Sequence, residues 1–147
     1  MKIEYVSGDL MQTSERVIIH GCNSHGVMGS GVARLIRDQF PVAYHVYRNS
    51  YLQDGLSLGT IVWAETCGKI IGNAITQRNY GRVQDIYVDY DAVRSAMKNV
   101  NAYCVEHGIA RVAMPKIGAG LGGGDWIVIA KIIEDESLDF TPVVYVL

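Results

Sequence analysis

Cysteine and long apolar runs are scarce in this sequence, and each scarcity excludes a class of protein. The 147 residues include three cysteines, far apart and without a C-x-x-C pair, which argues against a disulfide framework and a zinc site. Apolar and polar residues alternate at the start of the sequence as they do in a β-strand, and no signal-peptide core is present. The longest apolar runs are too short to cross a bilayer. We therefore expect a cytoplasmic protein without a membrane partner.

Several familiar catalytic motifs are also missing. The chain has no H-E-x-x-H, no G-x-S-x-G and no D-x-D-x metal loop, and it lacks the Gly-Lys-Ser/Thr of a nucleotide P-loop. A formal net charge of −2 and a pI near 6.0 give no global basic field, so we expect no dedicated binding to a nucleic-acid backbone. We expect neither a metal nor a cofactor, and the composition is compatible with a small charged ligand.

The hydrophobic pattern predicts a single domain over residues 1–147, with 49% hydrophobic residues to build its core. The predicted strands are residues 3–6, 16–20, 59–64, 69–75, 111–114 and 143–146. The predicted helices are residues 32–40, 41 toward 55, 89 or 91 to 108, and 126–133. Strands interleaved with helices over short connections predict a three-layer α/β/α fold with a mixed, largely parallel sheet. We expect this domain to be a monomer.

Glycine is abundant and is concentrated in two places. Five of the sixteen glycines fall within residues 118–124, directly before an apolar helical pattern. Residues 21–31 repeat the arrangement, since they follow a short apolar run and lead into the first predicted helix. Glycine backbone can turn successive N–H groups toward one point, and a helix start adds partial positive charge, so both segments predict an anion site, with phosphate as the guest. Such junctions gather at the carboxyl ends of parallel strands, although either segment alone also fits an ordinary flexible turn.

The first glycine-rich segment also carries candidate catalytic groups. His20 and His25 flank Asn23, so two proton carriers and an amide lie within a few residues. His20 stands at the end of a buried strand, where it is either catalytic or a hydrogen-bonded structural residue, and the same choice is open for His25. Asn23 suits a sugar with several hydroxyls. Cys22 is a small apolar filler or, alternatively, a thiolate beside the ligand.

Three further features have both a structural and a functional interpretation. Asp9 follows the first strand and either caps a short helix or accepts a hydrogen bond from the exocyclic amine of a purine. Asp125 is first of all a helix N-cap. The polar loop 77–85 overhangs the predicted cleft, where Arg78 and Arg82 meet either a diphosphate or solvent.

A set of motifs in a fixed order resembles the macrodomain family. The motifs are Val6-Ser7-Gly8-Asp9-Leu10, Ile19-His20-Gly21-Cys22-Asn23 with Gly29-Ser30-Gly31-Val32-Ala33, the segment from Met114 to Trp126, and the ending Val144-Tyr145-Val146-Leu147. They span essentially the whole chain. The sequence looks most similar to the compact branch that includes yeast-type ADP-ribose-1″-phosphate phosphatases and terminal ADP-ribose–glutamate hydrolases.

The resemblance implies a three-layer α/β/α domain whose cleft binds ADP-ribose. It implies that Asp9 accepts from the adenine amine, that Tyr145 helps to wall the adenine pocket, and that Asn23 contacts the distal ribose. Residues 29–32 would flank the diphosphate, and residues 117–122 would wrap the phosphates and distal ribose from the opposite side. The implied ligand-binding residues are Gly8, Asp9, Leu10, Asn23, Met28, Gly29, Gly31, Val32, Thr76, Pro115, Ile117, Gly118, Ala119, Gly120, Leu121, Gly122 and Tyr145. The candidate catalytic residues are His20, Asn23 and His25.

Within this branch the resemblance favours a phosphatase. The terminal hydrolases use a lysine after the middle strand and an aspartate in the second glycine loop, where this chain has Gln77 and Gly122. A glutamine cannot form the covalent imine that a lysine forms with an opened ribose. The run from Ile19 to Asn23 instead matches the Ile-His-x-Cys-Asn run of the phosphatase-like branch.

We therefore hypothesise a metal-independent ADP-ribose-1″-phosphate phosphatase, which hydrolyses the 1″-phosphate monoester to ADP-ribose and phosphate. His20 would orient water or protonate the leaving oxygen, and glycine-loop amides would stabilise the developing charge. Two alternatives stay open. One is a reader that binds ADP-ribose or ADP-ribosylated macromolecules with little catalysis, and the other is a hydrolase that removes ADP-ribose from modified protein or nucleic acid.

Overall fold

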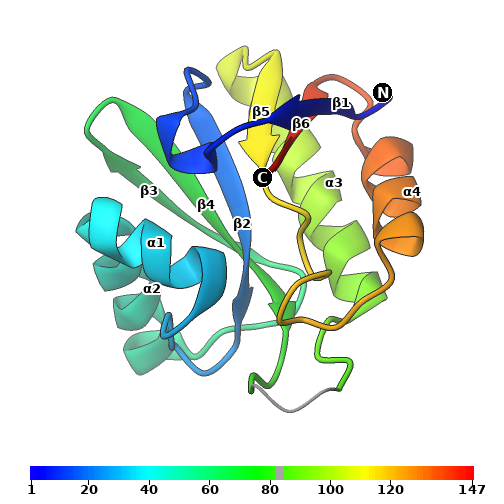
Figure 1. The fold of residues 1–147 in the computed structure, drawn as a ribbon. Coiled ribbons are helices and arrows are strands. Elements are labelled where there is room, and N and C mark those ends of the chain that lie inside the picture. Colours follow the sequence, from blue (N-terminus) through cyan, green and yellow to red (C-terminus); the bar gives the residue numbers. More distant parts are fainter. Residues whose placement is uncertain (82–84) are drawn as a thin grey trace.

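Six strands form one sheet in the computed structural model, which describes residues 1–81 and 85–147 (Figure 1). The strands are β1 (Glu4–Ser7), β2 (Val17–Asn23), β3 (Ile61–Thr66), β4 (Lys69–Gln77), β5 (Arg111–Met114) and β6 (Thr141–Val146). Their order is β1-β6-β5-β2-β4-β3, and only β3 and β4 pair in antiparallel fashion. This confirms the predicted mixed, largely parallel sheet. The central strands β2 and β4 run past their predicted ends, to Asn23 and Gln77.

Helices cover both faces of this sheet. They are α1 (Gly31–Gln39), α2 (Pro41–Asp54), α3 (Tyr90–His107) and α4 (Trp126–Glu136), with a short 3₁₀ helix η1 (Leu10–Gln12). Helices α1 and α2 lie on one face and α3 and α4 on the other, which confirms the three-layer α/β/α architecture (Figure 1). Within residues 1–81 and 85–147, no helix is both long enough and apolar enough to cross a membrane.

The helix boundaries follow from local capping chemistry. Pro41 opens α2, where its missing N–H costs nothing. The Asp89 side chain accepts from the Ala92 amide at the start of α3, and that helix ends at Gly108 in the left-handed conformation. The Asp125 side chain caps α4 in the same way. The sequence predictions for these boundaries are therefore confirmed.

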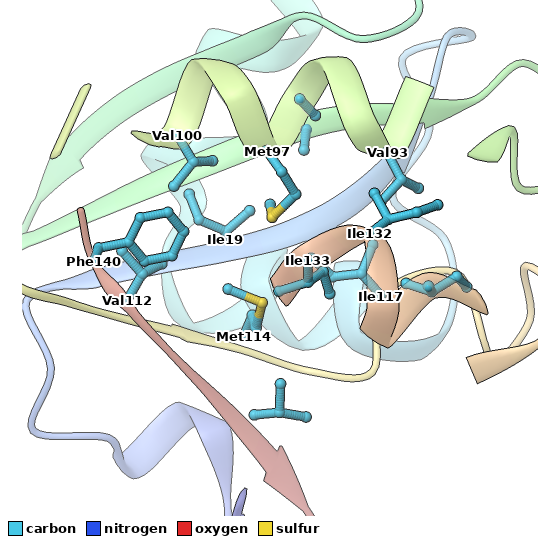
Figure 2. Close-up of a cluster of buried hydrophobic side chains, with 14 of the residues drawn as sticks. Ile19, Val93, Met97, Val100, Val112, Met114, Ile117, Ile132, Ile133 and Phe140 are labelled. Atoms are coloured by element: carbon cyan, nitrogen blue, oxygen red, sulfur yellow. The ribbon is translucent and has the colours of Figure 1, made fainter. Parts of the chain in front are cut away.

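Most of the hydrophobic core lies between the sheet and the layer formed by α3 and α4 (Figure 2). There Ile19 of β2 packs with Met97 of α3 and Ile133 of α4, and all three are buried. Side chains alternate along a strand, so the neighbours of Ile19 point to the opposite face. Ile18 belongs to the cluster beneath α1 and α2, and His20 lies on the same side.

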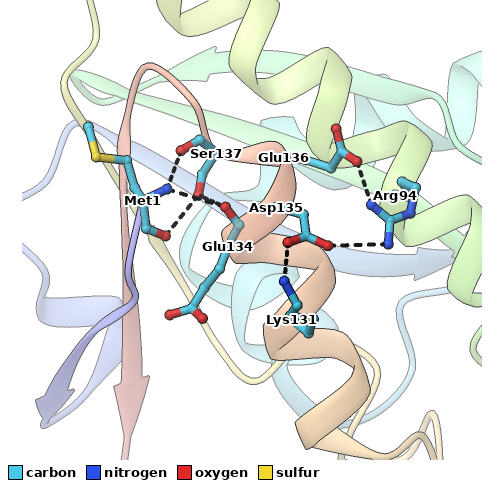
Figure 3. A network of polar contacts seen from close by, with 7 residues as sticks. All are labelled: Met1, Arg94, Lys131, Glu134, Asp135, Glu136 and Ser137. Carbon is cyan, nitrogen blue, oxygen red and sulfur yellow. Dashed lines mark hydrogen bonds and ion pairs between the residues drawn. The ribbon is translucent and has the colours of Figure 1, made fainter.

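Polar contacts join α3, α4 and the N-terminus on the outer side of the second helical layer (Figure 3). Arg94 of α3 pairs with Glu136 at 2.6 Å and with Asp135 at 3.7 Å. The Met1 amino group donates to the Ser137 carbonyl at the end of α4. Because the charged partners are partly exposed, solvent screens these pairs and they contribute little to stability.

Candidate functional site

A cleft of about 660 Å³ opens at the carboxyl ends of β2, β4 and β5, and both glycine-rich segments line it. In open α/β sheets ligands bind at the carboxyl ends of the strands, and the cleft lies there. Its volume suits a small-molecule ligand. The lining residues are Gly21, Cys22, Asn23, Val27, Gly29, Ser30, Gly31, Val32, Ala33, Gln77, Tyr80, Gly81, Pro115, Lys116, Ile117, Gly118, Gly120, Leu121 and Gly122. The predicted meeting of the two segments is therefore observed.

The N-terminus of α1 forms one wall of this cleft. Ser30 is extended (φ −156°, ψ 168°) and its side chain makes no capping hydrogen bond, and the first turn of α1 contains no acidic residue. The first N–H groups of an α-helix have no partner within the helix, and they carry the positive end of its dipole. Helices α3 and α4, in contrast, are capped by aspartates. The start of α1 therefore offers unused donors to a ligand.

The second glycine-rich segment forms the opposite wall. A Cβ added to Gly122 would lie 2.6 Å from the Gly118 carbonyl oxygen, and the Gly124 amide donates to that same oxygen at 2.8 Å. The loop is thus folded tightly on itself. The Leu121 side chain reaches across the cleft, since its Cδ1 lies 3.3 Å from the place of a Cβ on Gly31. The two walls face each other.

Among the residues that the structure describes, one basic residue and no acidic one line the cleft. Lys116 lines the cleft, and its Nζ lies 5.8 Å from the centre of the Trp126 ring. No Asp, Glu or His is among the lining residues that the structure describes. An uncapped helix start and a lysine in a cleft without carboxylates together favour an anionic ligand.

Asn23 lines the cleft and is held firmly at the end of β2. Its side-chain oxygen accepts from the His25 amide at 3.0 Å, and its Nδ2 donates to the Val27 carbonyl at 2.8 Å. The buried Tyr47 hydroxyl donates to the Asn23 backbone carbonyl at 2.5 Å. Burial raises the pKa of the Tyr47 phenol, which keeps it a donor. One N–H of the Asn23 amide is left to contact a ligand.

His20 does not reach the cleft, contrary to the prediction that it contacts substrate. The ring is fully buried on the face of β2 that packs beneath α2. Asn73 donates through Nδ2 to the Ala43 and Val62 carbonyls, so its Oδ1 accepts from His20 Nε2 at 2.6 Å. Burial lowers the pKa of His20 to about 4, although the hydrogen bond to Asn73 opposes this shift. His20 is a neutral structural residue at pH 7.

His25 lies at the rim of the cleft rather than within it. It is exposed, its Nε2 lies 3.0 Å from the Asn79 side-chain oxygen, and its ring meets Tyr80 edge to face at 6.0 Å. Tyr80 and Gly81 line the cleft, so this part of the predicted loop lies beside it as expected. Arg78 is exposed and does not line the cleft, and Arg82 lies outside the described residues.

The residues predicted for the adenine end gather beside the cleft but outside its lining. The Asp9 side chain accepts from the Met11 amide at 2.9 Å, which confirms its capping role. Gly8 donates to the Val146 carbonyl, and Leu10 packs in the same cluster as Tyr145. Contact of these residues with adenine stays a prediction.

Three other predicted ligand-binding residues do not line the cleft. Met28 is buried in the cluster that contains Tyr47, Thr76 is buried beneath Gly21, and Ala119 packs against the core. Lining residues absent from the predicted set are Gly21, Cys22, Val27, Ser30, Ala33, Gln77, Tyr80, Gly81 and Lys116. One signal accounts for Ser30 and Ala33, since the whole first turn of a helix after a glycine segment contributes to an anion site.

The sequence profile of the Macro domain family matches residues 19–133 of this chain. The chain belongs to the macrodomain family. A solved macrodomain, that of Mycobacterium tuberculosis DarG, superposes on this one with a TM-score of 0.86 at 24% identity, covering 97% of this chain and 96% of the other. The superposition confirms the macrodomain fold.

Curated relatives of this macrodomain include hydrolases that act on ADP-ribose derivatives. The ADP-ribose 1″-phosphate phosphatase of Scheffersomyces stipitis is 27% identical, over 99% of both chains. The ADP-ribose glycohydrolase OARD1 of Bos taurus is 26% identical, over 99% of this chain and 92% of its own. These similarities support a hydrolase of ADP-ribose derivatives, and the finer choice between reactions depends on the cleft.

Proposed function

We propose that this macrodomain is an ADP-ribose-1″-phosphate phosphatase. The observation that carries the proposal is the uncapped start of α1, which faces a glycine loop and Lys116 across a cleft of about 660 Å³. Backbone N–H groups, the helix dipole and the lysine charge all favour phosphate groups. The end-to-end similarity to a fungal phosphatase of the same specificity agrees with this choice.

The chemistry proposed is attack of water on the phosphorus of the 1″-phosphate, with cleavage of its bond to the ribose oxygen and proton transfer to that oxygen from solvent. With His20 outside the cleft, no carboxylate or imidazole is found among the lining residues within 1–81 and 85–147. Rate enhancement then comes from positioning and from stabilising the charge on the phosphoryl oxygens. The Asn23 amide, the α1 amides and Lys116 would supply the donors.

A second candidate function is binding of ADP-ribose with little catalysis. The absence of a carboxylate or an imidazole among the described lining residues favours it, because a reader needs the same donors and no such proton carrier. Release of ADP-ribose from modified macromolecules has less support. Gln77 lines the cleft where the terminal hydrolases have their lysine, and its amide, which donates to the Asn79 carbonyl at 2.8 Å, is no nucleophile.

One set of incubations tests these functions. The purified protein is mixed with ADP-ribose 1″-phosphate, with ADP-ribosylated protein and with ADP-ribosylated DNA, and free phosphate and free ADP-ribose are followed over time. Calorimetry with ADP-ribose measures binding in parallel. We expect phosphate release from the first substrate. Binding without any turnover would overturn the phosphatase in favour of the reader, and ADP-ribose release from a macromolecule would overturn it in favour of the glycohydrolase.

A further inference from the structure

Tyr80 is the one aromatic side chain among the described residues that line the cleft. It is 53% exposed, so its ring and its hydroxyl are accessible from the cleft. Ligand clefts are lined by apolar surface and a few well-placed polar groups, and a tyrosine supplies both in one side chain. Its phenol can also carry a proton in a reaction.

Polar contacts hold the loop of Tyr80 against the turn that follows β2. Ser24 donates to the Arg78 carbonyl from its backbone amide at 3.3 Å and from its hydroxyl at 3.1 Å. His25 Nε2 donates to the Asn79 side-chain oxygen at 3.0 Å. Functional side chains on loops need this kind of support, because a loop positions a group only where the surrounding structure fixes it. Tyr80 is therefore an exposed residue in a loop that is anchored to the cleft wall.

The same contacts place Tyr80 at the end of the cleft where Asn23 stands. The Asn23 side-chain oxygen accepts from the His25 amide at 3.0 Å, and the His25 ring meets the Tyr80 ring edge to face with centroids 6.0 Å apart. Asn23 is the residue expected to contact the distal ribose, the sugar that carries the phosphate in the proposed reaction. The phenol therefore lies at the end of the cleft that the leaving oxygen would occupy.

Two other described lining residues carry a proton on a side chain, and neither suits this step as well. Cys22 is 4% exposed, and burial raises the pKa of its thiol, so the thiol retains its proton. Lys116 lies on the opposite wall, where its Nζ is 5.8 Å from the centre of the Trp126 ring. Tyr80 combines an accessible proton with a position near the distal ribose.

We propose that Tyr80 is a catalytic residue, the general acid that protonates the leaving ribose oxygen in the phosphatase reaction. Water attacks phosphorus, the bond from phosphorus to the C1″ oxygen breaks, and the electron pair of that bond stays on the oxygen. The proton of the Tyr80 hydroxyl moves to this oxygen. The attacking water keeps one proton on the phosphate product and releases the other to solvent, which returns a proton to the phenolate. The inference rests on the proposed function.

The test is Tyr80→Phe, which keeps the ring and removes the hydroxyl. With ADP-ribose 1″-phosphate as the substrate, we expect kcat to fall about 10²-fold or more, the contribution of a general acid. KM and the affinity for ADP-ribose, measured by calorimetry, should stay within about threefold of the parent, because at most one neutral hydrogen bond is lost from the bound state. The kcat of the parent should fall at alkaline pH, where a phenol loses its proton, and the profile of Tyr80→Phe should lack this fall.

The matched control is Tyr44→Phe, the same substitution at a tyrosine of α2 that does not line the cleft. It should keep kcat within about twofold of the parent, as expected for a change away from the site. His25→Ala removes the ring that supports Tyr80 and leaves the phenol in place, so it should lose less activity than Tyr80→Phe. A larger loss in His25→Ala would make His25 the acid and would overturn the proposal.

Two further results for Tyr80→Phe would overturn the inference. One is turnover at the parental rate, or a pH profile that keeps its alkaline fall. The other is a clearly lowered thermal unfolding midpoint together with the loss of activity, which would make the hydroxyl structural. The parent protein separates this inference from the proposed function. If the parent binds ADP-ribose but releases no phosphate, the phosphatase fails, whereas an active parent with an equally active Tyr80→Phe variant removes Tyr80 and leaves the phosphatase in place.

Discussion

The two glycine-rich walls of the cleft are held in place by different means. Residues 21–31 are anchored by side chains from other elements, through the Tyr47 hydroxyl on Asn23 and through the buried pair of His20 and Asn73. Residues 117–124 are anchored through their backbone, since the Gly122 carbonyl accepts from the Tyr87 and Val88 amides and a Cβ on Gly122 would collide with the Gly118 carbonyl. One wall is held by side chains from other elements and the other by backbone contacts.

The two helices that follow these segments also differ in how their N-termini are capped. The α4 start is occupied by the Asp125 carboxylate, which accepts from the Ile127 amide at 2.9 Å. The α1 start has no such cap at Ser30. The same pattern of glycines before a helix therefore serves two purposes, because only an uncapped helix start has donors to offer to a ligand.

The anchoring of the first wall should depend on pH. His20 has a pKa of about 4 in the folded protein and about 6.5 when unfolded, so the unfolded state binds more protons between these values. Stability from this group is complete above pH 6.5 and is lost as the pH falls toward 4, by about 3 kcal/mol in total. Urea unfolding at pH 7, 5.5 and 4.5 should show a steeper loss for the parent than for His20→Gln.

The same variant tests the position of His20 outside the cleft. We expect His20→Gln to bind ADP-ribose at pH 7 within about threefold of the parent, since the ring is buried and does not line the cleft. Equal pH slopes for parent and variant would contradict the buried neutral histidine. A loss of turnover of about 10²-fold or more with unchanged stability would restore its catalytic role.

The anchoring of the second wall should fail when its glycines acquire a side chain. Gly122→Ala places a methyl group 2.6 Å from a backbone oxygen, so we expect a loss of about 2 kcal/mol in the free energy of unfolding. Gly120→Ala is the control, because nothing lies within 4 Å of its Cβ, and it should change stability by less than about 0.5 kcal/mol. Urea unfolding measures both. Equal stability of the two variants would show that this loop is not held by its own backbone.

The open start of α1 should close when a carboxylate is placed on it. In Ser30→Asp the new side chain caps the helix as Asp125 caps α4, and its charge repels a phosphate. We expect calorimetry to show affinity for ADP-ribose reduced about tenfold or more, with stability unchanged or higher. Ser30→Ala is the control and should have little effect, because the serine side chain makes no cap. Retained affinity in Ser30→Asp would place the phosphates elsewhere.

The smallest effect is expected at Lys116. It is exposed, so its attraction for a phosphate is partly screened, and Lys116→Ala should lower affinity by up to about fivefold. The difference from the parent should shrink as salt is raised from 50 to 500 mM, concentrations chosen to shorten the screening length. Lys98→Ala, at an exposed position of α3, is the control for a general charge effect. The same loss in both variants would remove Lys116 from the site.

Much of the fold could be predicted from the sequence, because the signals are local. The alternating apolar residues of β2 and the caps at Asp89 and Asp125 lie within a few positions of the elements that they define. The two walls of the cleft were also predictable, since glycines between strand and helix mark the carboxyl end of a parallel sheet. The prediction that His20 contacts substrate could not be checked in the sequence. His20 and Asn23 lie equally close to the glycine-rich turn, but the His20 side chain is buried against Asn73 and the Asn23 side chain lines the cleft.

The sequence by itself determined the order of strands and helices, the macrodomain resemblance and the two glycine walls, because periodicity, caps and backbone freedom are properties of neighbouring residues. Only the tertiary structure decided that His20 is buried against Asn73 and that the Thr76 hydroxyl has no hydrogen-bond partner beside Gly21. It also decided that Lys116 is the basic side chain among the described residues that line the cleft. Burial and pairing depend on residues far apart in the chain, such as His20 and Asn73, 53 positions apart. No local pattern contains that information.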